Sequence, residues 1–287
     1  MTAGLAVLLL SAMPNAQSAS NVEALLARVG DRIAEYYERV RDVICIERSV
    51  VQPIGLSYSP DGFARTVESE LRIEAESDDA RGRIPNVLRH IRRVNGRLPN
   101  ERDKKDRSGC TDPEPLSIEP LAFLLPGRRG EYEFVPGGVT KERNRDVVMI
   151  NFETANRKSN VVLIEDKYGH DDCFDWAGHI AMRGRIWIDA ASYDVIRIEK
   201  YLRGPVDVRV PTAIQRRHHL DGYVTLQRDD MTIRYRRVAF SDPEDVIVLP
   251  ESIDSVTMVR GGLQSTRRSQ TFSEYKRFLT GGRVTQN

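Results

Sequence analysis

The side chains that could bind a metal ion are concentrated in one short segment. Six histidine, aspartate and cysteine residues fall between positions 170 and 179: His170, Asp171, Asp172, Cys173, Asp175 and His179. A His-x-x-Cys step followed by a second histidine supplies ligand types that zinc prefers. Structural zinc sites usually take four ligands from two such pairs, and the sequence has no second pair of matching spacing. We therefore expect no metal site and interpret the segment as a solvated loop.

The rest of the sequence offers little catalytic chemistry. Arg216 and Arg217 precede His218 and His219, a combination that suits a small anion site but is also typical of a charged loop. The chain contains no glycine-rich phosphate loop, nucleophile elbow, HExxH motif or pair of catalytic carboxylates. We predict no catalytic residue, no cofactor and no enzymatic activity. A hydrolase with an unfamiliar site is the remaining enzymatic alternative.

The three cysteines differ in their neighbours. Cys110 and Cys173 lie among polar residues, in RSGCTD and HDDCFD, whereas Cys45 lies in an apolar run and is predicted to be a core residue. In an oxidising compartment a Cys110–Cys173 disulfide would close a long loop and stabilise the fold by about 4 kcal/mol. Because spacing does not determine connectivity, free thiols at both positions are the alternative.

The first twenty residues resemble an export signal. An apolar run over residues 3–13 precedes Pro14 and a stretch of small residues that ends at Ser20. The run is too short to span a bilayer and leads into a cleavage-type region, although no lysine or arginine precedes it. We predict a signal-peptide-like segment over 1–20, no transmembrane segment in the mature chain, and a periplasmic or secreted product. A buried or disordered N-terminal segment is the alternative.

Length and charge narrow the classes of protein further. The 287 residues suffice for one large domain or two small ones. The 43 basic and 42 acidic side chains leave a net charge of +1, which excludes the broad basic surface of a dedicated nucleic-acid-binding protein.

Helical periodicity is strongest directly after the export signal. Ser20 and Glu23 fit a capping box. Apolar residues then recur at helical spacing: Val22, Leu25, Leu26, Val29, Ile33, Tyr36, Tyr37, Val40 and Ile44. This pattern predicts an amphipathic helix of about 20 residues that must pack against an apolar surface. A short second helix is predicted over 118–125.

The pattern then changes to the period of two that is typical of strands. Strands are predicted over 63–76, 87–94, 131–135, 146–154, 160–166, 180–189, 195–201, 223–227, 232–240, 252–259 and 268–278. One face of these strands is apolar and the other is charged, as in antiparallel sheets with one solvated side. Turns are predicted at Asn95-Gly96, Gly137-Gly138 and Gly261-Gly262. The lack of crossover helices excludes a doubly wound fold.

The segment 184–201 predicts a hairpin about Ser192. Its expected pairs are Ile186 with Ile198, Ile188 with Ile196, Arg185 with Glu199, and Trp187 with Arg197. Within 232–240 the apolar residues change parity between Tyr235 and Val238, which predicts a bulge at Arg236-Arg237.

Together these elements predict a mainly β (α+β) fold with a single curved antiparallel sheet, a half-barrel of about ten strands covered by the N-terminal amphipathic helix. The order of a first helix running into VRDVICIERSVV, then GRIWIDAASYDVIRIEK, VLPESIDSVTMV and TFSEYKRF, resembles the lipoprotein-carrier fold of LolA and LolB, shared by the anti-sigma regulator RseB. The resemblance implies a single domain over 21–287. The segments near 99–115 and 202–222 depart from it as insertions.

A sheet that is apolar on one face must cover that face, and a curved one leaves a groove suited to acyl chains. We therefore expect an exported, non-enzymatic carrier that holds a lipid or a lipoprotein acyl chain. The alternatives are a sensor or interaction module that binds an envelope protein partner, and a groove that is simply packed core. Inward-facing residues predicted to line the sheet are Val67, Leu71, Ile73, Ile186, Ile188, Ile196 and Ile198. The sequence does not identify which of them would contact a ligand.

Overall fold

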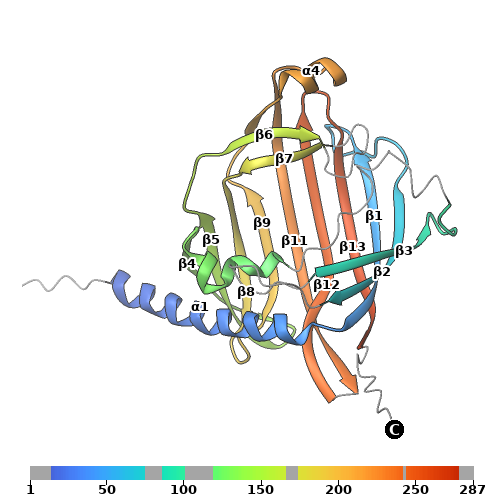
Figure 1. Ribbon diagram of the computed structural model, residues 1–287. Coiled ribbons are helices and arrows are strands. Elements are labelled where there is room, and N and C mark those ends of the chain that lie inside the picture. The colour runs from blue at the N-terminus through green and yellow to red at the C-terminus, as the bar shows by residue number, and fades with distance from the viewer. Residues whose placement is uncertain (1–13, 75–85, 101–118, 166–173, 242–243, 278–287) are drawn as a thin grey trace, which may run out of the picture.

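The computed structural model describes residues 14–74, 86–100, 119–165, 174–241 and 244–277, which form a large curved sheet crossed by one long helix (Figure 1). The helical elements are α1 (Pro14–Arg39), the 3-10 helix η2 (Glu119–Leu124), α3 (Pro126–Arg129) and α4 (Thr212–His218). The strands are β1 (Val43–Ile54), β2 (Arg65–Glu74), β3 (Asn86–Val94), β4 (Tyr132–Glu142), β5 (Arg145–Thr154), β6 (Asn160–Glu165), β7 (Phe174–His179), β8 (Met182–Asp189), β9 (Val195–Leu202), β10 (Val206–Arg209), β11 (Tyr223–Ser241), β12 (Glu244–Arg260) and β13 (Ser265–Arg277).

The described strands form a thirteen-stranded sheet that does not close. Ten strands follow the order β3-β2-β1-β13-β12-β11-β9-β8-β5-β4, while β10, β6 and β7 branch from β11. All pairs in this path are antiparallel, and the bridge between β10 and β6 is parallel. β3 and β4 end the path on opposite sides. The predicted fold class is therefore confirmed: the chain is mainly β, with one large antiparallel sheet and an N-terminal helix. The strand number exceeds the expected ten because β1, β7 and β10 were not predicted as strands.

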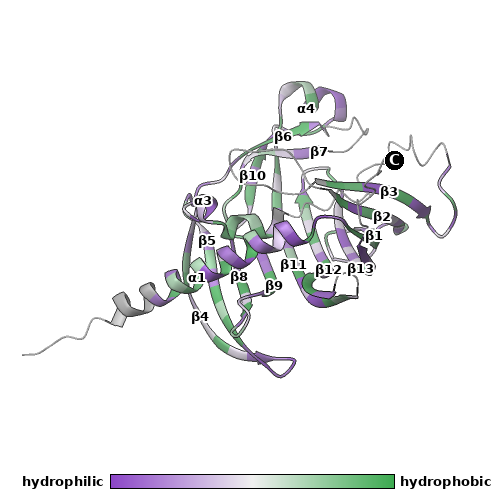
Figure 2. Ribbon diagram, turned by 60° about the horizontal axis from the view of Figure 1, so that its bottom comes forward, coloured by the Kyte–Doolittle hydropathy of each residue, from purple (hydrophilic) through white to green (hydrophobic). Residues whose placement is uncertain are grey.

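Helix α1 lies across one face of the sheet, which we call the inner face. Six residues of its predicted apolar stripe are buried: Val22, Leu26, Val29, Ile33, Tyr37 and Val40. They join one core cluster with inward residues of the sheet, among them Ile150, Ile186 and Ile233. In Figure 2 the strands behind α1 carry green, hydrophobic segments. Each fully buried side chain of this kind contributes roughly 1.5–3 kcal/mol before conformational entropy is subtracted.

The helix is shorter at its C-terminal end than its apolar stripe predicted. Asp42 has a φ of 65° and turns the chain out of the helix, so Ile44 belongs to β1. Gly30 of α1 lies against η2, and a Cβ there would be in ordinary van der Waals contact with the Leu124 carbonyl oxygen at 3.4 Å. The second predicted helix exists as η2, with 3-10 geometry.

The β8–β9 hairpin confirms most of its predicted register. Ile186 faces Ile198, Arg185 faces Glu199, and Trp187 faces Arg197. The expected pair of Ile188 with Ile196 is wrong, because a register shift after Trp187 places Val195 opposite Ile188. Ile196 consequently packs with Val147 and Trp187 in a separate small cluster.

Two further local expectations are corrected. The bulge predicted at Arg236-Arg237 is wrong. The pairing of β11 with β12 shifts between Arg234 and Tyr235, where β12 carries the extra residue Glu251. The apolar residues on both sides of the shift still join the main core: Ile233, Tyr235, Val238 and Phe240. Gly137 and Gly138 form a bulge within β4 rather than a hairpin turn.

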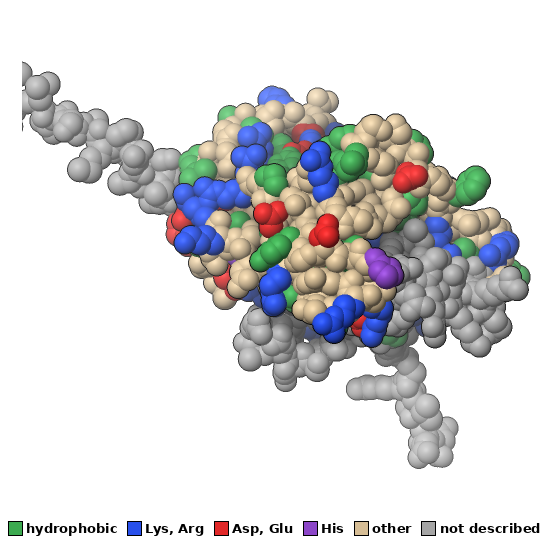
Figure 3. All heavy atoms as spheres, turned by 90° about the horizontal axis from the view of Figure 1, so that it is seen from above, with side chains coloured by type: hydrophobic (Ala, Val, Ile, Leu, Met, Phe, Trp, Pro, Cys, Tyr) green, Lys and Arg blue, Asp and Glu red, His purple; other side chains and the backbone are tan. Residues whose placement is uncertain are grey.

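The segment 202–222 supports a second core at one end of the sheet. It contributes β10 and α4, and Val208 and Ile214 pack there with Leu163 and Leu226. Figure 3, which views this end, shows basic and acidic side chains interspersed with separate apolar ones, so charge of one sign does not gather on this face. Residues 101–118, most of the other expected insertion, lie outside the described residues.

Candidate ligand site

The inner face contains a narrow apolar cavity between α1, η2 and the sheet. The lining residues come from six strands and two helical segments: Tyr36, Cys45, Leu71, Ile73, Val87, Pro120, Ile233, Tyr235, Pro250, Ile253, Phe272 and Tyr275. The free volume is about 20 Å³, room for roughly one water molecule. An acyl chain could therefore enter only if α1 or η2 moved away from the sheet.

The few polar atoms at the cavity are uncharged. Burial raises the pKa of the Cys45 thiol to about 12, and the nearby Glu47 carboxylate raises it further, so the thiol stays protonated at neutral pH. Burial also raises the pKa of the Tyr36 hydroxyl. The Tyr275 hydroxyl donates a hydrogen bond to the Pro250 carbonyl oxygen at 2.6 Å. The predicted core position of Cys45 is confirmed, and it is a free thiol. The lining of the cavity suits an apolar ligand, and the protonated Cys45 thiol is a poor nucleophile.

Helix α1 is fastened over the cavity by polar contacts to the ends of two hairpins, which we call the latch. Arg32 donates to Asp194 at 2.6 Å, and Arg28 donates to the Tyr193 hydroxyl at 2.6 Å, both in the β8–β9 turn. At the other end of the helix, Arg39 pairs with Asp245 at the start of β12. Because charged contacts exchange readily with water, such a fastening can release more easily than a packed interface.

The Asp245 carboxylate also accepts a hydrogen bond from a second arginine. Arg277 of β13 donates to its carboxylate at 2.6 Å. Burial opposes ionisation of Asp245, but the hydrogen bonds from Arg39 and Arg277 outweigh it and lower the pKa of the carboxyl. The Asp245 carboxylate is therefore ionised at neutral pH.

Beyond the cavity the inner face becomes polar. Glu47 of β1 is completely buried. Arg89 donates to both of its carboxylate oxygens, at 2.9 and 3.0 Å, and Gln270 donates to one of them at 2.7 Å. Burial raises the pKa of the Glu47 carboxyl, an effect that Arg89 and Gln270 oppose. Ser49 and Ser69 are also completely buried, and their hydroxyl oxygens have no hydrogen-bond partner.

We call Glu47, Ser49, Ser69, Arg89 and Gln270 the polar cluster. Sequence reasoning missed it. The available signal was the parity of β1, because Glu47 and Ser49 alternate in step with the apolar residues Val43 and Cys45. A charged residue at a predicted inward position is informative, since burial of a charge requires a partner.

The residues singled out from the sequence do not assemble into a site in the described part of the chain. Cys110 and His170–Cys173 lie outside the described residues, so the disulfide stays a prediction. Asp175 and His179 lie at opposite ends of β7, and the His179 ring nitrogen Nε2 is 2.8 Å from the Asn156 carbonyl oxygen. Among the described residues no group of three metal-ligating side chains is found.

The residues of the expected anion patch lie on α4 and at its end. Arg217 pairs with Glu165 at 2.5 Å, and the His218 ring packs edge-on against Phe174 with centroids 4.9 Å apart. His219 ends the helix with a φ of 53°. Since Arg217 and His218 already engage protein groups, their arrangement fits a charged surface better than an anion site.

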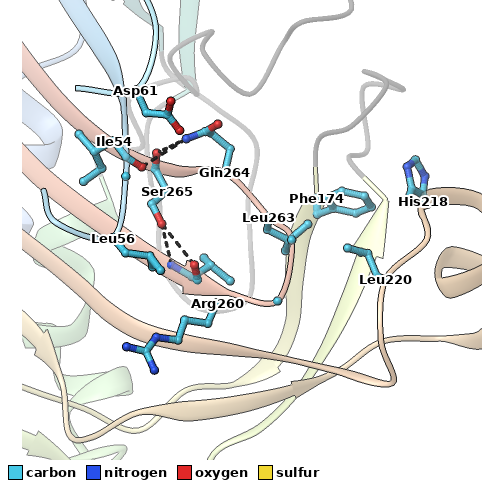
Figure 4. Close-up of a pocket in the computed structure, with 14 residues that line it drawn as sticks. Ile54, Leu56, Asp61, Phe174, His218, Leu220, Arg260, Leu263, Gln264 and Ser265 are labelled. Atoms are coloured by element: carbon cyan, nitrogen blue, oxygen red, sulfur yellow. Dashed lines mark hydrogen bonds between the residues drawn. The ribbon is translucent and has the colours of Figure 1, made fainter. Parts of the chain in front are cut away.

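A second hollow lies at the α4 end of the sheet (Figure 4). This pocket of about 710 Å³ is bordered by Leu56, His218, Leu220 and Leu263 together with backbone of the β12–β13 turn. Two of its polar side chains engage protein groups: Ser265 accepts from the Val259 amide at 3.0 Å, and Gln264 donates to the Ile54 carbonyl oxygen at 3.3 Å. The predicted turn at Gly261-Gly262 is confirmed there, with both φ values positive.

No protein-family model matches the sequence, and no curated protein matches it. Among solved structures, the chain is similar to a domain from Vibrio parahaemolyticus described as that of an outer membrane lipoprotein-sorting protein, with 12% identity and a TM-score of 0.47 over 92% of this chain and 96% of that one. It is similar to a LolA superfamily protein from Nitrosomonas europaea, with 9% identity and a TM-score of 0.35 over 92% and 97%. It is also similar to a DUF1329 family protein from Desulfovibrio piger, with 11% identity and a TM-score of 0.41 over 91% and 95%. Because these identities and TM-scores are low, we base the function on this chain's own residues.

Proposed function

We propose that the protein is an exported, non-enzymatic carrier that holds a lipid or a lipoprotein acyl chain between α1 and the inner face of its sheet. The observation that carries the proposal is the apolar cavity beneath a helix that charged groups fasten near its middle and at its C-terminal end. Cavity and latch have separate tasks in this proposal. Release of the latch opens the groove, and the apolar lining then replaces contacts with α1 by contacts with the ligand.

The predicted signal-peptide-like segment over 1–20 supports the location of this carrier outside the cytoplasm. Among the described residues, no helix combines the length and the apolar composition that crossing a bilayer requires. A carrier for acyl chains needs the apolar groove and no reacting group, which agrees with the protonated Cys45 thiol at the cavity.

The proposal is tested by blocking the cavity from its edge strand. Val87 lines the cavity, while its neighbour Leu88 is 46% exposed on the opposite face of β3. We expect Val87→Trp to weaken uptake of a fluorescent fatty acid by at least about tenfold, since a filled cavity loses apolar contact area. Leu88→Trp adds the same side chain outside the groove and should bind like the wild type.

Two results would contradict the proposal. One is a wild-type protein that takes up no fluorescent fatty acid and carries no copurifying acyl species in native mass spectrometry. The other is equal loss of binding in Val87→Trp and Leu88→Trp, because the effect would then not depend on the cavity.

A second candidate function is an interaction module for an envelope protein. Several apolar side chains are exposed in the β1–β2 loop and the turn after β3, namely Leu56, Tyr58, Phe63 and Leu98, with Phe63 exposed to 98%. The two segments adjoin, because the Asn95 amide donates to the Thr66 carbonyl oxygen at 2.8 Å. Recovery of one stoichiometric protein partner that is lost in Phe63→Ser would favour this function.

A further inference from the structure

A further hollow, of about 490 Å³, lies across β4, β5, β8 and β9 on the side of the sheet opposite α1, which we call the outer face (Figure 1). Side chains that border it alternate with core residues of the inner face: Asn151 precedes Phe152, and Arg185 precedes Ile186. Since successive side chains of a strand point to opposite faces, the hollow is separated from the apolar cavity by the sheet itself. Its volume lies within the range of small-molecule sites, about 300–1,000 Å³.

Two arginines face this hollow without an ion-pair partner. Arg183 and Arg185 are alternate residues of β8, so their side chains leave the same face about 6.6 Å apart. In the part of the chain that the structure describes, neither forms an ion pair, and Arg183 makes no side-chain hydrogen bond. Arg185 donates from Nε to Asn151 at 2.7 Å, and its guanidinium carbon lies 5.7 Å from the centroid of the Trp187 ring. Both of these partners are uncharged, so they orient Arg185 without cancelling its charge.

Two of the three carboxylates that border the hollow share one arginine. Arg157 donates to Glu133 and to Glu153, at 2.7 Å in each case. Arg203 lies 3.8 Å from Glu153 and supplies a second positive charge. This corner of the hollow therefore combines two carboxylates with two guanidinium groups, and its charges balance.

The third carboxylate is also paired. Glu199 forms an ion pair with Arg197 and accepts a hydrogen bond from the Tyr201 hydroxyl. Each acid at the hollow thus has a cation of its own, and the charges of Arg183 and Arg185 remain as an excess of two. Guanidinium groups bind phosphate through paired hydrogen bonds. A phosphomonoester carries about −1.5 to −2 charges at pH 7, so it matches this excess better than a carboxylate or a sulfate ester, which carries one.

We propose that Arg183 and Arg185 form an anion site on the outer face that binds a phosphomonoester group. Both guanidinium groups donate to the phosphate oxygens. The paired carboxylates keep free lone pairs, which accept from hydroxyl groups of the molecule that carries the phosphate. That molecule is a soluble sugar phosphate or a lipid with a phosphomonoester headgroup. The site goes beyond the carrier function, because it lies on the other face of the sheet.

The test compares two esters that differ in charge and hardly in shape. Glucose 6-phosphate carries about one negative charge more than glucose 6-sulfate at pH 8. Isothermal titration calorimetry measures the affinity of each ester for the wild type, for Arg183→Gln/Arg185→Gln and for the control Arg72→Gln. Arg72 is an exposed arginine of β2 that pairs with Glu70 at 3.0 Å and does not border the hollow. Cosedimentation with phosphatidylcholine vesicles, with and without phosphatidic acid, tests the lipid source.

We expect the wild type and Arg72→Gln to bind the phosphate ester at least about tenfold more tightly than the sulfate ester, and the double variant to bind both equally weakly. This result assigns the site to a soluble molecule. Cosedimentation that requires both phosphatidic acid and the two arginines assigns it to a lipid headgroup.

The inference is overturned if the wild type neither prefers the phosphate ester nor cosediments with phosphatidic acid. It is also overturned if the preference or the cosedimentation survives in the double variant. The double variant should take up a fluorescent fatty acid like the wild type, because the cavity lies on the inner face. Loss of the anion site therefore leaves the carrier function standing, and failure of fatty-acid uptake leaves the anion site standing.

Discussion

The two halves of the inner face have the same backbone and opposite chemistry. Beneath α1 the face is apolar and is covered by a helix, whereas beyond Cys45 it carries a completely buried carboxylate, its partly buried arginine partner and two buried serines. Both halves are built by the same strand β1, in which every second residue points inward. Strand alternation thus fixes which residues face inward, and residue type alone decides whether that position becomes an apolar lining or a polar contact.

The two halves also differ in the free energy that is lost when one of their contacts is removed. An apolar contact that is lost costs its own transfer free energy, while a buried charge that loses its partner costs the desolvation of the group left behind. The latch belongs to neither half. Its arginines and Asp245 are partly exposed, so each of these groups should contribute less than a buried group.

The largest effect is expected in the polar half. Arg89→Ala would leave Glu47 buried with Gln270 as a remaining donor, so we expect the free energy of unfolding to fall by roughly 3–5 kcal/mol. Urea unfolding followed by circular dichroism measures this. The matched control is Arg93→Ala on the same strand. Its contact with Glu68 is 3.8 Å long and its side chain is 58% exposed, so its loss should cost less than about 1 kcal/mol.

A further pair of substitutions separates an unpaired charge from lost packing. Replacing both partners, as in Glu47→Leu with Arg89→Leu, should recover much of the stability that Arg89→Ala loses, because no buried charge remains. If Arg89→Ala were no more harmful than Arg93→Ala, the polar half would not differ from an ordinary exposed surface.

An intermediate effect is expected at the latch. Arg32→Ala removes one contact to Asp194 and should cost about 1 kcal/mol of stability, because Asp194 keeps the hydrogen bond from the Ser192 hydroxyl and the ion pair with Arg237. Under the carrier proposal it should also speed uptake of a fluorescent fatty acid in stopped-flow measurements, since α1 is released more often. Glu38→Ala on the same helix is the control, because Glu38 pairs with Arg41 close to it in the sequence. Equal uptake rates in both variants would separate the latch from ligand entry.

The hydrophobic pattern of the sequence predicted the regular elements and their pairing, but it missed single irregularities such as bulges and helix ends. The α1 stripe and the pairs of Ile186 with Ile198 and of Trp187 with Arg197 follow from periodicity, because every residue of the pattern supports the same register. The irregularities do not repeat. The chain leaves the helical direction at Asp42 because of a single positive φ. The parity change is visible in β11, whereas the extra residue, Glu251, lies in its partner strand β12.

The candidate site shows the same limit more strongly. Glu47 could be assigned an inward position from the parity of β1, but its partners Arg89 and Gln270 come from strands far away in the sequence. Only the pairing of β1 with β2 and β13, and of β2 with β3, brings them together. The apolar cavity likewise combines residues from α1 and from the last strand, so its lining could not be derived from any single segment.

The smallest effect is expected from pH, and it acts on the latch. The pKa of Asp245 in the folded protein lies below its ordinary value of 3.8, because the hydrogen bonds from Arg39 and Arg277 outweigh the opposing effect of burial. A depressed carboxyl pKa stabilises the fold fully above the ordinary value, and this stabilisation is lost as the pH falls through the folded-state value. The free energy of unfolding of the wild type should therefore exceed that of Asp245→Asn by less than about 1 kcal/mol near neutral pH, and the gap should close below about pH 3.8. Asp146→Asn, at a carboxylate that is 77% exposed, should show almost no gap at any pH. A gap for Asp245→Asn that widened towards low pH would mean that the charged carboxylate does not help to hold α1 on the sheet.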